Sequence, residues 1–238
     1  MGYQGRILMM RHPETVANTQ HFFSGRRDVP LTPHGEEERE HGIAALEAFR
    51  PDVIWCSPIS RCEDLARMAG ERIGCAVEPW DDLIEIDFGE LEGRSFGGTF
   101  GVAKGVFPWP LGPDGRSVPA PGAESFEHLF ERADRVVARL VGVRGRVACV
   151  THGGFLRGFM ARAYQLPYET FWNVHIANVA SLFLTTNGQN LALGGFNLTP
   201  EEAIARCTCP TMYDMRDIWG TEERLAREAD APTEGRDS

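Results

Sequence analysis

Two adjacent side chains near the start of the sequence, Arg11 and His12, combine an anion-binding guanidinium group with a nucleophilic imidazole. They follow a short apolar run, residues 7–10, which is typical of a buried strand. In sheets flanked by helices, ligands bind at the carboxyl edge, where this pair is expected to lie. Taken alone, the pair favours a strand that simply runs out into solvent, because so short a motif is a weak signal. Residues further along the chain change this interpretation.

A second arginine, Arg61, follows another short apolar run, residues 53–56. Ser60 and Glu63 match a capping box, so we expect Ser60 to cap a helix whose first turn contains Arg61. Helix N-termini attract anions, whereas a cation there opposes the helix dipole. An anionic ligand beside Arg61 would explain its position, and a solvated surface arginine is the alternative.

A second histidine, His152, follows the predicted buried strand 146–151 and precedes Gly153 and Gly154. Glycines allow the backbone to approach a ligand closely. A core histidine is the ordinary interpretation of such a residue, but a strand end that leads through two glycines into a helix is a poor place for one. His152 is therefore a second candidate for the chemistry.

An acidic segment, residues 83–93, supplies a candidate proton donor. Its apolar and acidic residues alternate, which predicts a half-exposed extended segment with Glu85 and Asp87 on one face. A carboxyl group held against a like charge suits a general acid. Alternation alone favours a solvated acidic edge.

These groups would together suit phosphoryl transfer. The guanidinium groups of Arg11 and Arg61 match the oxygens of a phosphoryl group, and a neutral His12 imidazole can attack phosphorus. His152, if protonated, would add positive charge, and Glu85 could give its proton to the leaving alkoxide. This arrangement requires no metal.

The elements that must position these side chains alternate between strands and helices. The apolar runs 7–10 and 53–56 and the segments 76–78 and 146–151 predict strands, and helices are expected after Thr32, Ser60, Ser125 and Thr199. Asn187-Gly188 predicts a hairpin. The sequence therefore predicts an α/β fold, a three-layer sandwich whose mostly parallel central sheet is flanked by helices.

One domain, residues 1–238, is expected, because no linker or internal repeat divides the chain. Residues 13–31 are predicted to be a loop. Residues 94–123 are dense in Gly and Pro and contain several aromatic residues, which predicts a lid-like insertion without regular structure. The charged tail from about residue 217 is predicted to be mobile.

Composition limits the partners and the compartment. A net charge of -10 argues against sequence-independent binding of nucleic acid, and no apolar run is long enough for a membrane span. The N-terminus does not have the layout of a signal peptide, and the 6 scattered cysteines suggest reduced thiols, so a cytoplasmic protein is expected. Cys207-Thr208-Cys209 lacks the further ligands that a metal site needs.

Ordered motifs over roughly residues 6–197 resemble those of the histidine phosphatase superfamily, also called the phosphoglycerate mutase-like proteins. The matching segments are Arg11-His12-Pro13-Glu14-Thr15, Pro30-Leu31-Thr32-Pro33-His34-Gly35, Ser57-Pro58-Ile59-Ser60-Arg61, Leu83-Ile84-Glu85 with Gly89 and Glu92-Gly93, Pro121-Gly122-Ala123-Glu124-Ser125, and Val150-Thr151-His152-Gly153-Gly154.

The resemblance implies a phosphoglycerate mutase-like fold and a reaction through a phosphohistidine, with no cofactor and no metal. It implies that His12 is the nucleophile, that Arg11, Arg61 and His152 bind phosphate, and that Glu85 is the general acid and then the base. The residues that would line the phosphate and substrate pocket are Asn18, Ser24, Gly25 and Gly153.

Two residues depart from the family pattern. Pro13 replaces glycine, which removes one backbone N–H near the phosphate and favours an extended His12. Leu65 stands where many members carry threonine, one helical turn after Arg61. We expect altered fine geometry and a retained function.

The segment around Glu85 resembles the phosphatase branch, so hydrolysis of a small phosphorylated metabolite is predicted. A phosphoglycerate mutase-type transfer is the first alternative, and Lys104 is the one candidate for the extra cationic contacts that a mutase needs. A non-catalytic protein that binds a phosphorylated ligand is the second. The aromatic residues of the insertion suggest a partly apolar or flat leaving group, and whether the chain forms a homodimer is left open.

Overall fold

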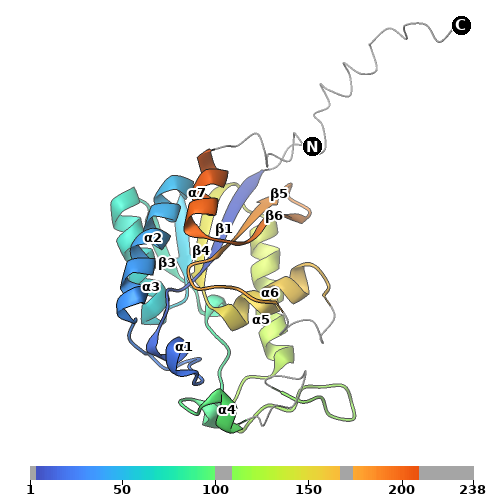
Figure 1. Ribbon diagram of the computed structural model, residues 1–238. Helices are drawn as coiled ribbons and strands as arrows, with labels where there is room; N and C mark the ends of the chain where they lie inside the picture. The colour runs from blue at the N-terminus through green and yellow to red at the C-terminus, as the bar shows by residue number, and fades with distance from the viewer. Residues whose placement is uncertain (1–3, 100–108, 167–173, 209–238) are drawn as a thin grey trace, which may run out of the picture.

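The strands of the computed structural model, which describes residues 4–99, 109–166 and 174–208, form a sheet in the order β3-β2-β4-β1-β5-β6 (Figure 1). The strands are β1 (Gly5–Arg11), β2 (Val53–Cys56), β3 (Ala76–Pro79), β4 (Gly145–Thr151), β5 (Ser181–Thr186) and β6 (Leu191–Leu198). The helices are α1 (Val16–Gln20), α2 (Pro33–Phe49), α3 (Ser60–Ile73), α4 (Phe96–Thr99), α5 (Phe126–Val141), α6 (Gly153–Ala163) and α7 (Pro200–Thr208). Two 3₁₀ turns are η1 (Asp81–Leu83) and η2 (Gly89–Leu91).

The register of the parallel strands gathers the candidate residues at one edge. β4 pairs in parallel with β1 and β2, and β5 and β6 close the other side of the sheet as antiparallel strands. Arg11 pairs with Thr151, and Cys56 pairs with Val150. Because three neighbouring strands end at nearly the same level, His12, Ser57 and His152 leave the sheet side by side.

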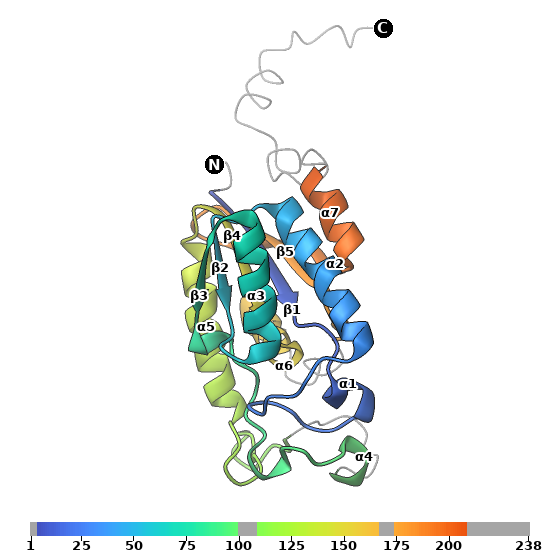
Figure 2. The same cartoon turned by 90° about the vertical axis from the view of Figure 1, so that its left-hand side faces the viewer.

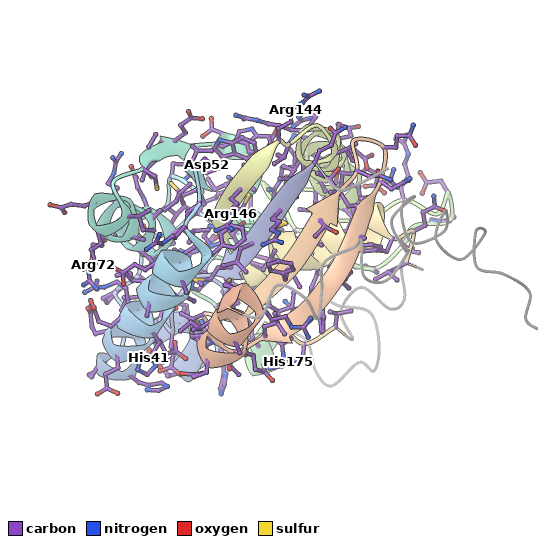
Figure 3. All side chains as sticks on the ribbon, turned by 90° about the horizontal axis from the view of Figure 1, so that it is seen from above. His41, Asp52, Arg72, Arg144, Arg146 and His175 are labelled. Atoms are coloured by element: carbon purple, nitrogen blue, oxygen red, sulfur yellow. The ribbon has the colours of Figure 1, made fainter. Side chains whose placement is uncertain are left out.

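Helices cover both faces of the sheet, which confirms the predicted three-layer α/β fold. Helices α2, α3 and α7 lie on one face and α5 and α6 on the other (Figure 2), and the view from above shows the sheet between these layers (Figure 3). Leu8 and Met10 of β1 belong to the core under α2 and α3, whereas Ile7 and Met9 belong to the core under α5 and α6. A strand that is buried on both faces has no polar residues to alternate with, which is why residues 7–10 are a continuous apolar run.

The helix starts at Thr32 and Ser125 and the hairpin are confirmed. The Thr32 hydroxyl accepts a hydrogen bond from the Gly35 N–H at 2.9 Å, and the Ser125 hydroxyl accepts one from the His128 N–H at 3.1 Å. The turn between β5 and β6 places Gly188 at a φ of 86°, a conformation that favours glycine.

The predicted cap at Ser60 is wrong. Helix α3 begins at Ser60 itself, Ile59 occupies the cap position, and the Ser60 hydroxyl donates to Asp28 Oδ1 at 2.8 Å. Tertiary contact with the loop after α1 therefore competes successfully with the local capping bond. Arg61 still lies in the first turn, as expected.

The predicted extended segment 83–93 does not form. It contains the end of η1, an irregular stretch and η2, because partners outside the segment take its backbone groups. The Thr151 hydroxyl donates to the Leu83 carbonyl, and the Arg132 guanidinium donates to the Ile84 carbonyl. Glu85 and Asp87 consequently have separate environments, and Asp87 instead lies near Arg26 and accepts from the Gly89 N–H.

Short helices also occupy parts of the two segments that were predicted to lack regular structure. Helix α1 lies in the loop 13–31, and α4 lies at the start of the insertion 94–123. Within the insertion, residues 100–108 fall outside the described residues. Trp109 after this gap is buried, and its indole N–H donates to the Glu124 carbonyl at 2.9 Å.

The tail from about residue 217 lies outside the described residues, so its predicted mobility has no structural counterpart here. In the described part of the chain, no helix is both long enough and apolar enough to cross a membrane.

Candidate active site

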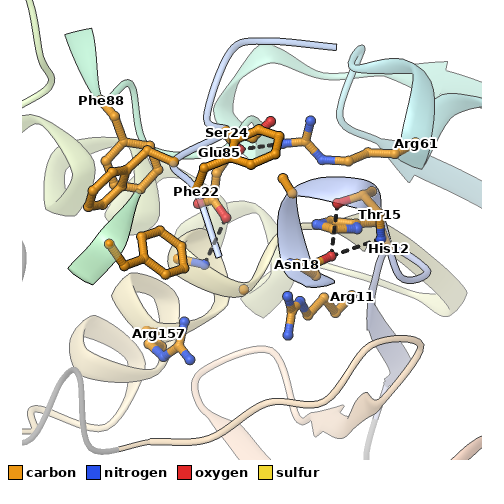
Figure 4. A pocket seen from close by; sticks show the side chains of 15 residues that line it. Arg11, His12, Thr15, Asn18, Phe22, Ser24, Arg61, Glu85, Phe88 and Arg157 are labelled. Carbon is orange, nitrogen blue, oxygen red and sulfur yellow. Dashed lines mark hydrogen bonds between the residues drawn. The ribbon is translucent and has the colours of Figure 1, made fainter. Parts of the chain in front are cut away.

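A cavity of ≈ 490 Å³ opens at the carboxyl edge of the parallel strands (Figure 4). It is lined by Arg11, His12, Thr15, Ala17, Asn18, Phe22, Phe23, Ser24, Arg61, Glu85, Phe88, Phe96, Gly153, Gly154 and Arg157. Of the residues that sequence analysis selected, only His152 and Gly25 are absent from this lining, and both contact Arg61 from behind. The predicted set therefore converges on one place.

The His12 ring is held in one tautomer by the residue that follows it. Its Nδ1 lies 2.7 Å from the Pro13 carbonyl oxygen. A carbonyl can only accept a hydrogen bond, so Nδ1 carries the proton and Nε2 keeps its lone pair. Burial, with Arg61 and Arg11 nearby, holds the pKa of His12 well below its ordinary value. The proline in place of glycine thus retains the carbonyl that orients the neutral ring.

Arg11 lies beside His12 with part of its guanidinium group unsatisfied. One Nη donates to the Ile176 carbonyl at 2.6 Å, whereas the buried Nε has no hydrogen-bond partner among the described residues. Burial and the neighbouring Arg157 lower the pKa of Arg11 to about 10, which leaves it charged at neutral pH. A buried donor without a partner is costly, so this N–H suits an anionic ligand.

Arg61 is caged by three backbone carbonyls of the loop that follows α1. Its Nη atoms donate to the carbonyls of Ser24 at 3.2 Å, Gly25 at 2.9 Å and Arg27 at 3.1 Å. Its Nε donates to His152 Nδ1 at 3.2 Å. These bonds fix the guanidinium plane against the cavity.

His152 is fully buried at the start of α6, behind Arg61. Since Nδ1 accepts from Arg61, the proton lies on Nε2, which donates to the Ser57 hydroxyl at 2.7 Å and also lies 3.4 Å from Cys62 Sγ. The His12 and His152 ring centres are 5.2 Å apart. Burial, with Arg61 and His12 nearby, holds the pKa of His152 well below its ordinary value. The protonated His152 that the sequence analysis considered is thus disfavoured in this structure.

These contacts predict opposite tautomers for the two histidines. In ¹⁵N NMR spectra of histidine-labelled protein, we expect His12 as the Nδ1–H form and His152 as the Nε2–H form. Because both pKa values are lowered, both rings should remain neutral as the pH falls below 6.5, the ordinary pKa of histidine. Protonation of His12 near pH 6.5 would contradict this assignment.

Two backbone N–H groups at the start of α6 hold the Glu85 carboxyl group in the cavity. Its Oε2 accepts from the Gly154 N–H and its Oε1 from the Phe155 N–H, each at 2.9 Å, at the N-terminus of α6. A Cβ at Gly154 would lie 2.4 Å from Glu85 Oε1. The absence of a side chain at Gly154 therefore allows the Glu85 carboxyl group to bind at the N-terminus of α6.

Asn18 is fixed from two sides. Its Oδ1 accepts from the Thr15 N–H at 3.0 Å, which closes the first turn of α1. The Asn178 amide donates to Asn18 Oδ1 at 3.3 Å and to the His12 carbonyl at 3.1 Å. Asn178 thus ties α1 to the His12 backbone, and no local sequence signal marked it.

Glu92 acts on the site from a distance. Its carboxylate accepts from the N–H groups of Gly25 at 2.9 Å and Arg26 at 3.0 Å. Space around Gly25 is equally restricted, since a Cβ there would lie 1.8 Å from the Ile86 carbonyl oxygen. Glu92 therefore holds the loop whose carbonyls cage Arg61.

Replacing Glu92 with glutamine should weaken this loop. Glu92 Oε1 accepts from both loop N–H groups, and Oε2 lies 3.1 Å from the Gly25 nitrogen. In Gln the amide N–H at the second position would face the Gly25 N–H, and loss of the negative charge weakens the remaining bonds, so the carbonyl cage around Arg61 loosens. We expect kcat/KM for phosphomonoesters to fall by about tenfold, the cost of roughly one hydrogen bond to a charged group. Steady-state kinetics test this, with Glu90→Gln on the exposed neighbouring position as the matched control. Equal kcat/KM for both variants and the wild type would refute the positioning role.

Sequence analysis missed several residues of the cavity. Arg157 follows His152 along α6, and its Nε donates to the Val174 carbonyl at 2.7 Å. Phe22, Phe23 and Phe88 lie in segments whose aromatic residues gave no periodic signal. Within the described residues, no cluster of three His, Cys, Asp or Glu side chains could hold a metal ion.

Comparison with known proteins gives consistent results. The sequence model of the histidine phosphatase superfamily (branch 1) matches residues 7–199. An acid phosphatase of Mycobacterium tuberculosis is 34% identical over 68% of this chain and 77% of its own length. A 2,3-bisphosphoglycerate-dependent phosphoglycerate mutase of Cytophaga hutchinsonii is 27% identical over 73% of this chain and 84% of its own. The structure of a mycobacterial glucosyl-3-phosphoglycerate phosphatase in complex with VO3 matches with a TM-score of 0.67 and 25% identity, covering 81% of this chain and 98% of that one.

Proposed function

This chain belongs to the histidine phosphatase superfamily, branch 1, and from that membership we propose that it hydrolyses phosphomonoesters through a phosphohistidine at His12. The solved relative and both sequence relatives are phosphatases or a mutase, which are enzymes. The substrate would be a small phosphorylated molecule.

One observation carries the proposal. The neutral His12, whose Nε2 keeps its lone pair, lines the same cavity as Arg11, whose buried Nε–H has no hydrogen-bond partner among the described residues. A nucleophile next to an unpaired, charged donor suits a phosphoryl group better than it suits any protein contact. The caged Arg61 guanidinium, which lines the same cavity as His12, would supply the second cationic contact.

In the first step, His12 Nε2 would attack phosphorus while the bond from phosphorus to the ester oxygen breaks. The electron pair goes to the leaving oxygen, and the Glu85 carboxyl gives that oxygen a proton, so the free alcohol leaves. Arg11 and Arg61 would hold the phosphoryl oxygens in line.

In the second step, the Glu85 carboxylate would take a proton from water as the water oxygen attacks phosphorus. The bond from phosphorus to Nε2 then breaks, its electron pair returns to His12, and phosphate is released. His152 would act on the phosphoryl group through Arg61, because its Nδ1 accepts from the Arg61 Nε–H and a proton on that nitrogen would break the contact. Gly153 would allow close approach of the α6 N-terminus to the phosphoryl oxygens, and Asn18, Ser24 and Gly25 would shape the pocket around them.

The test compares hydrolysis with transfer. Purified protein should release phosphate from p-nitrophenyl phosphate without added metal. Supplied with 3-phosphoglycerate and 2,3-bisphosphoglycerate, it should not interconvert phosphoglycerates faster than it releases phosphate. Absence of turnover on a panel of phosphomonoesters would favour a non-catalytic binding protein, and rapid interconversion would favour a mutase.

Finer expectations stay part of the proposal. The described cysteines, which are all free thiols, support a reducing compartment such as the cytoplasm. Residues 94–123 would act as a lid over the cavity, since Phe96 lines it and Trp109 packs on the body. A homodimer is a prediction that light scattering would test.

A further inference from the structure

Four phenylalanine rings line the cavity beside the proposed phosphate site. They are Phe22, Phe23, Phe88 and Phe96. Figure 4 shows Phe88 across the cavity from His12 and Arg61. The chemistry of phosphoryl transfer uses none of these rings, so their presence needs a separate explanation.

The rings form a preformed wall with a rigid backing. Phe23 contacts Phe96 edge-on at 4.6 Å and Phe88 at 4.8 Å between ring centres. Phe88 in turn lies 6.3 Å from buried Trp109, which continues the aromatic row into the core. Backbone bonds fix the same residues, from Phe23 N–H to the Arg94 carbonyl at 3.0 Å and from Phe96 N–H to the His21 carbonyl at 2.8 Å.

Burial differs along this wall in a way that points to a ligand. Phe23 is fully buried and Phe88 is 8% exposed, whereas Phe96, which also lines the cavity, is 38% exposed. Exposed apolar surface in a concave site is surface that a ligand can bury. Flat rings held edge-on to one another also offer their faces and edges to a further ring.

We propose that this Phe22–Phe23–Phe88–Phe96 wall binds a planar aromatic or similarly flat apolar group in the alcohol part of the phosphomonoester. The inference rests on the proposed function for turnover but not for binding. Binding of the ring needs only the aromatic wall and the cationic side chains beside it, which hold the anionic group of the ligand. A cavity of ≈ 490 Å³ falls in the range that holds a drug-sized ligand, so a phosphoryl group and one or two rings fit together.

Matched ligands separate ring binding from the reactivity of the leaving group. Ethyl phosphate and 2-phenylethyl phosphate both release alkyl alcohols and differ by one phenyl ring. We expect kcat/KM to be about tenfold or more higher for the phenyl compound, as for burial of an aromatic side chain. 3-Phosphoglycerate, a small anionic comparator, should be poorer than 2-phenylethyl phosphate. A preference for 3-phosphoglycerate, or equal values for the two alkyl esters, would overturn the proposal.

A binding measurement keeps the test independent of catalysis. By calorimetry, 2-phenylethylphosphonate, which cannot be hydrolysed, should bind about tenfold or more tightly than ethylphosphonate. If this preference is found without any turnover of the esters, ring binding by the aromatic wall is supported and the proposed phosphatase activity is refuted. Equal affinities would refute the aromatic wall whatever the turnover.

Variants locate the effect. Phe96→Ala should reduce the ratio between phenyl and ethyl compounds toward one, and Phe96→Leu should retain part of it. Phe196, on β6 and outside the cavity lining, is 39% exposed, so Phe196→Ala is the matched control and should keep the wild-type ratio. An unchanged ratio in Phe96→Ala, in protein that melts like the wild type, would contradict the role of the exposed ring.

Discussion

Replacing His12 with alanine is expected to lower kcat for phosphomonoester hydrolysis by about 10⁴-fold or more, as removal of a nucleophile does in other covalent mechanisms. The reason is local. Among the residues that the structure describes, no other imidazole with a free ring nitrogen lines the cavity, because His152 uses both of its nitrogens on Arg61 and Ser57 and lies behind the cavity surface. Steady-state assay with p-nitrophenyl phosphate measures the loss.

Two controls make this result interpretable. His34→Ala, an exposed position on α2, should keep wild-type kcat. Thermal melting of His12→Ala should show a folded protein, because the buried ring leaves a cavity that costs stability without removing an element of the fold. Turnover by His12→Ala within tenfold of the wild type would exclude His12 as the nucleophile.

Replacing Glu85 with glutamine is expected to slow hydrolysis of alkyl phosphates by about 10²- to 10⁴-fold, the range for loss of a general acid. An alkoxide needs its proton as the ester bond breaks, whereas p-nitrophenolate is a good leaving group without one. The variant should therefore still release p-nitrophenol in a rapid burst close to one equivalent. Steady turnover should then be slow, because no base activates water against the phosphohistidine.

Asp87→Asn is the matched control, since the sequence paired these two carboxyl groups and the structure separates them. Asp87 accepts from the Gly89 N–H at 2.8 Å and is absent from the cavity lining. Its variant should show no burst and should keep alkyl phosphate hydrolysis within about twofold of the wild type, as expected for a change away from the reacting atoms. Equal sensitivity of both leaving groups to Glu85→Gln would argue against a proton donor at this position.

Strand ends were predictable from the sequence, and the contacts behind them were not. Residues 7–10 and 147–150 are apolar because both of their faces are buried, so the positions of Arg11, His12 and His152 followed from local pattern. Pro13 in place of glycine also predicted altered fine geometry around His12, but only the structure shows that the Pro13 carbonyl orients the His12 ring.

Glu85 illustrates the limit of periodicity. Alternation in 83–93 predicted a half-exposed extended segment, and long-range bonds from Thr151 and Arg132 to its backbone prevent one. Its placement depends on N–H groups of α6 that lie 69 and 70 residues further along the chain. No local signal encodes such a partner. The same holds for Glu92, whose role became visible only through Gly25 and Arg61.

The most direct test of the central claim is to find the phosphoryl group on the protein. Wild-type protein mixed rapidly with a ³²P-labelled phosphomonoester and quenched in alkali should carry a label that acid removes, and mass spectrometry should place it on His12. Labelling at Nε2, the nitrogen opposite the Pro13 contact, is the predicted result. A label on any other residue, or rapid turnover without any labelled intermediate, would contradict the account.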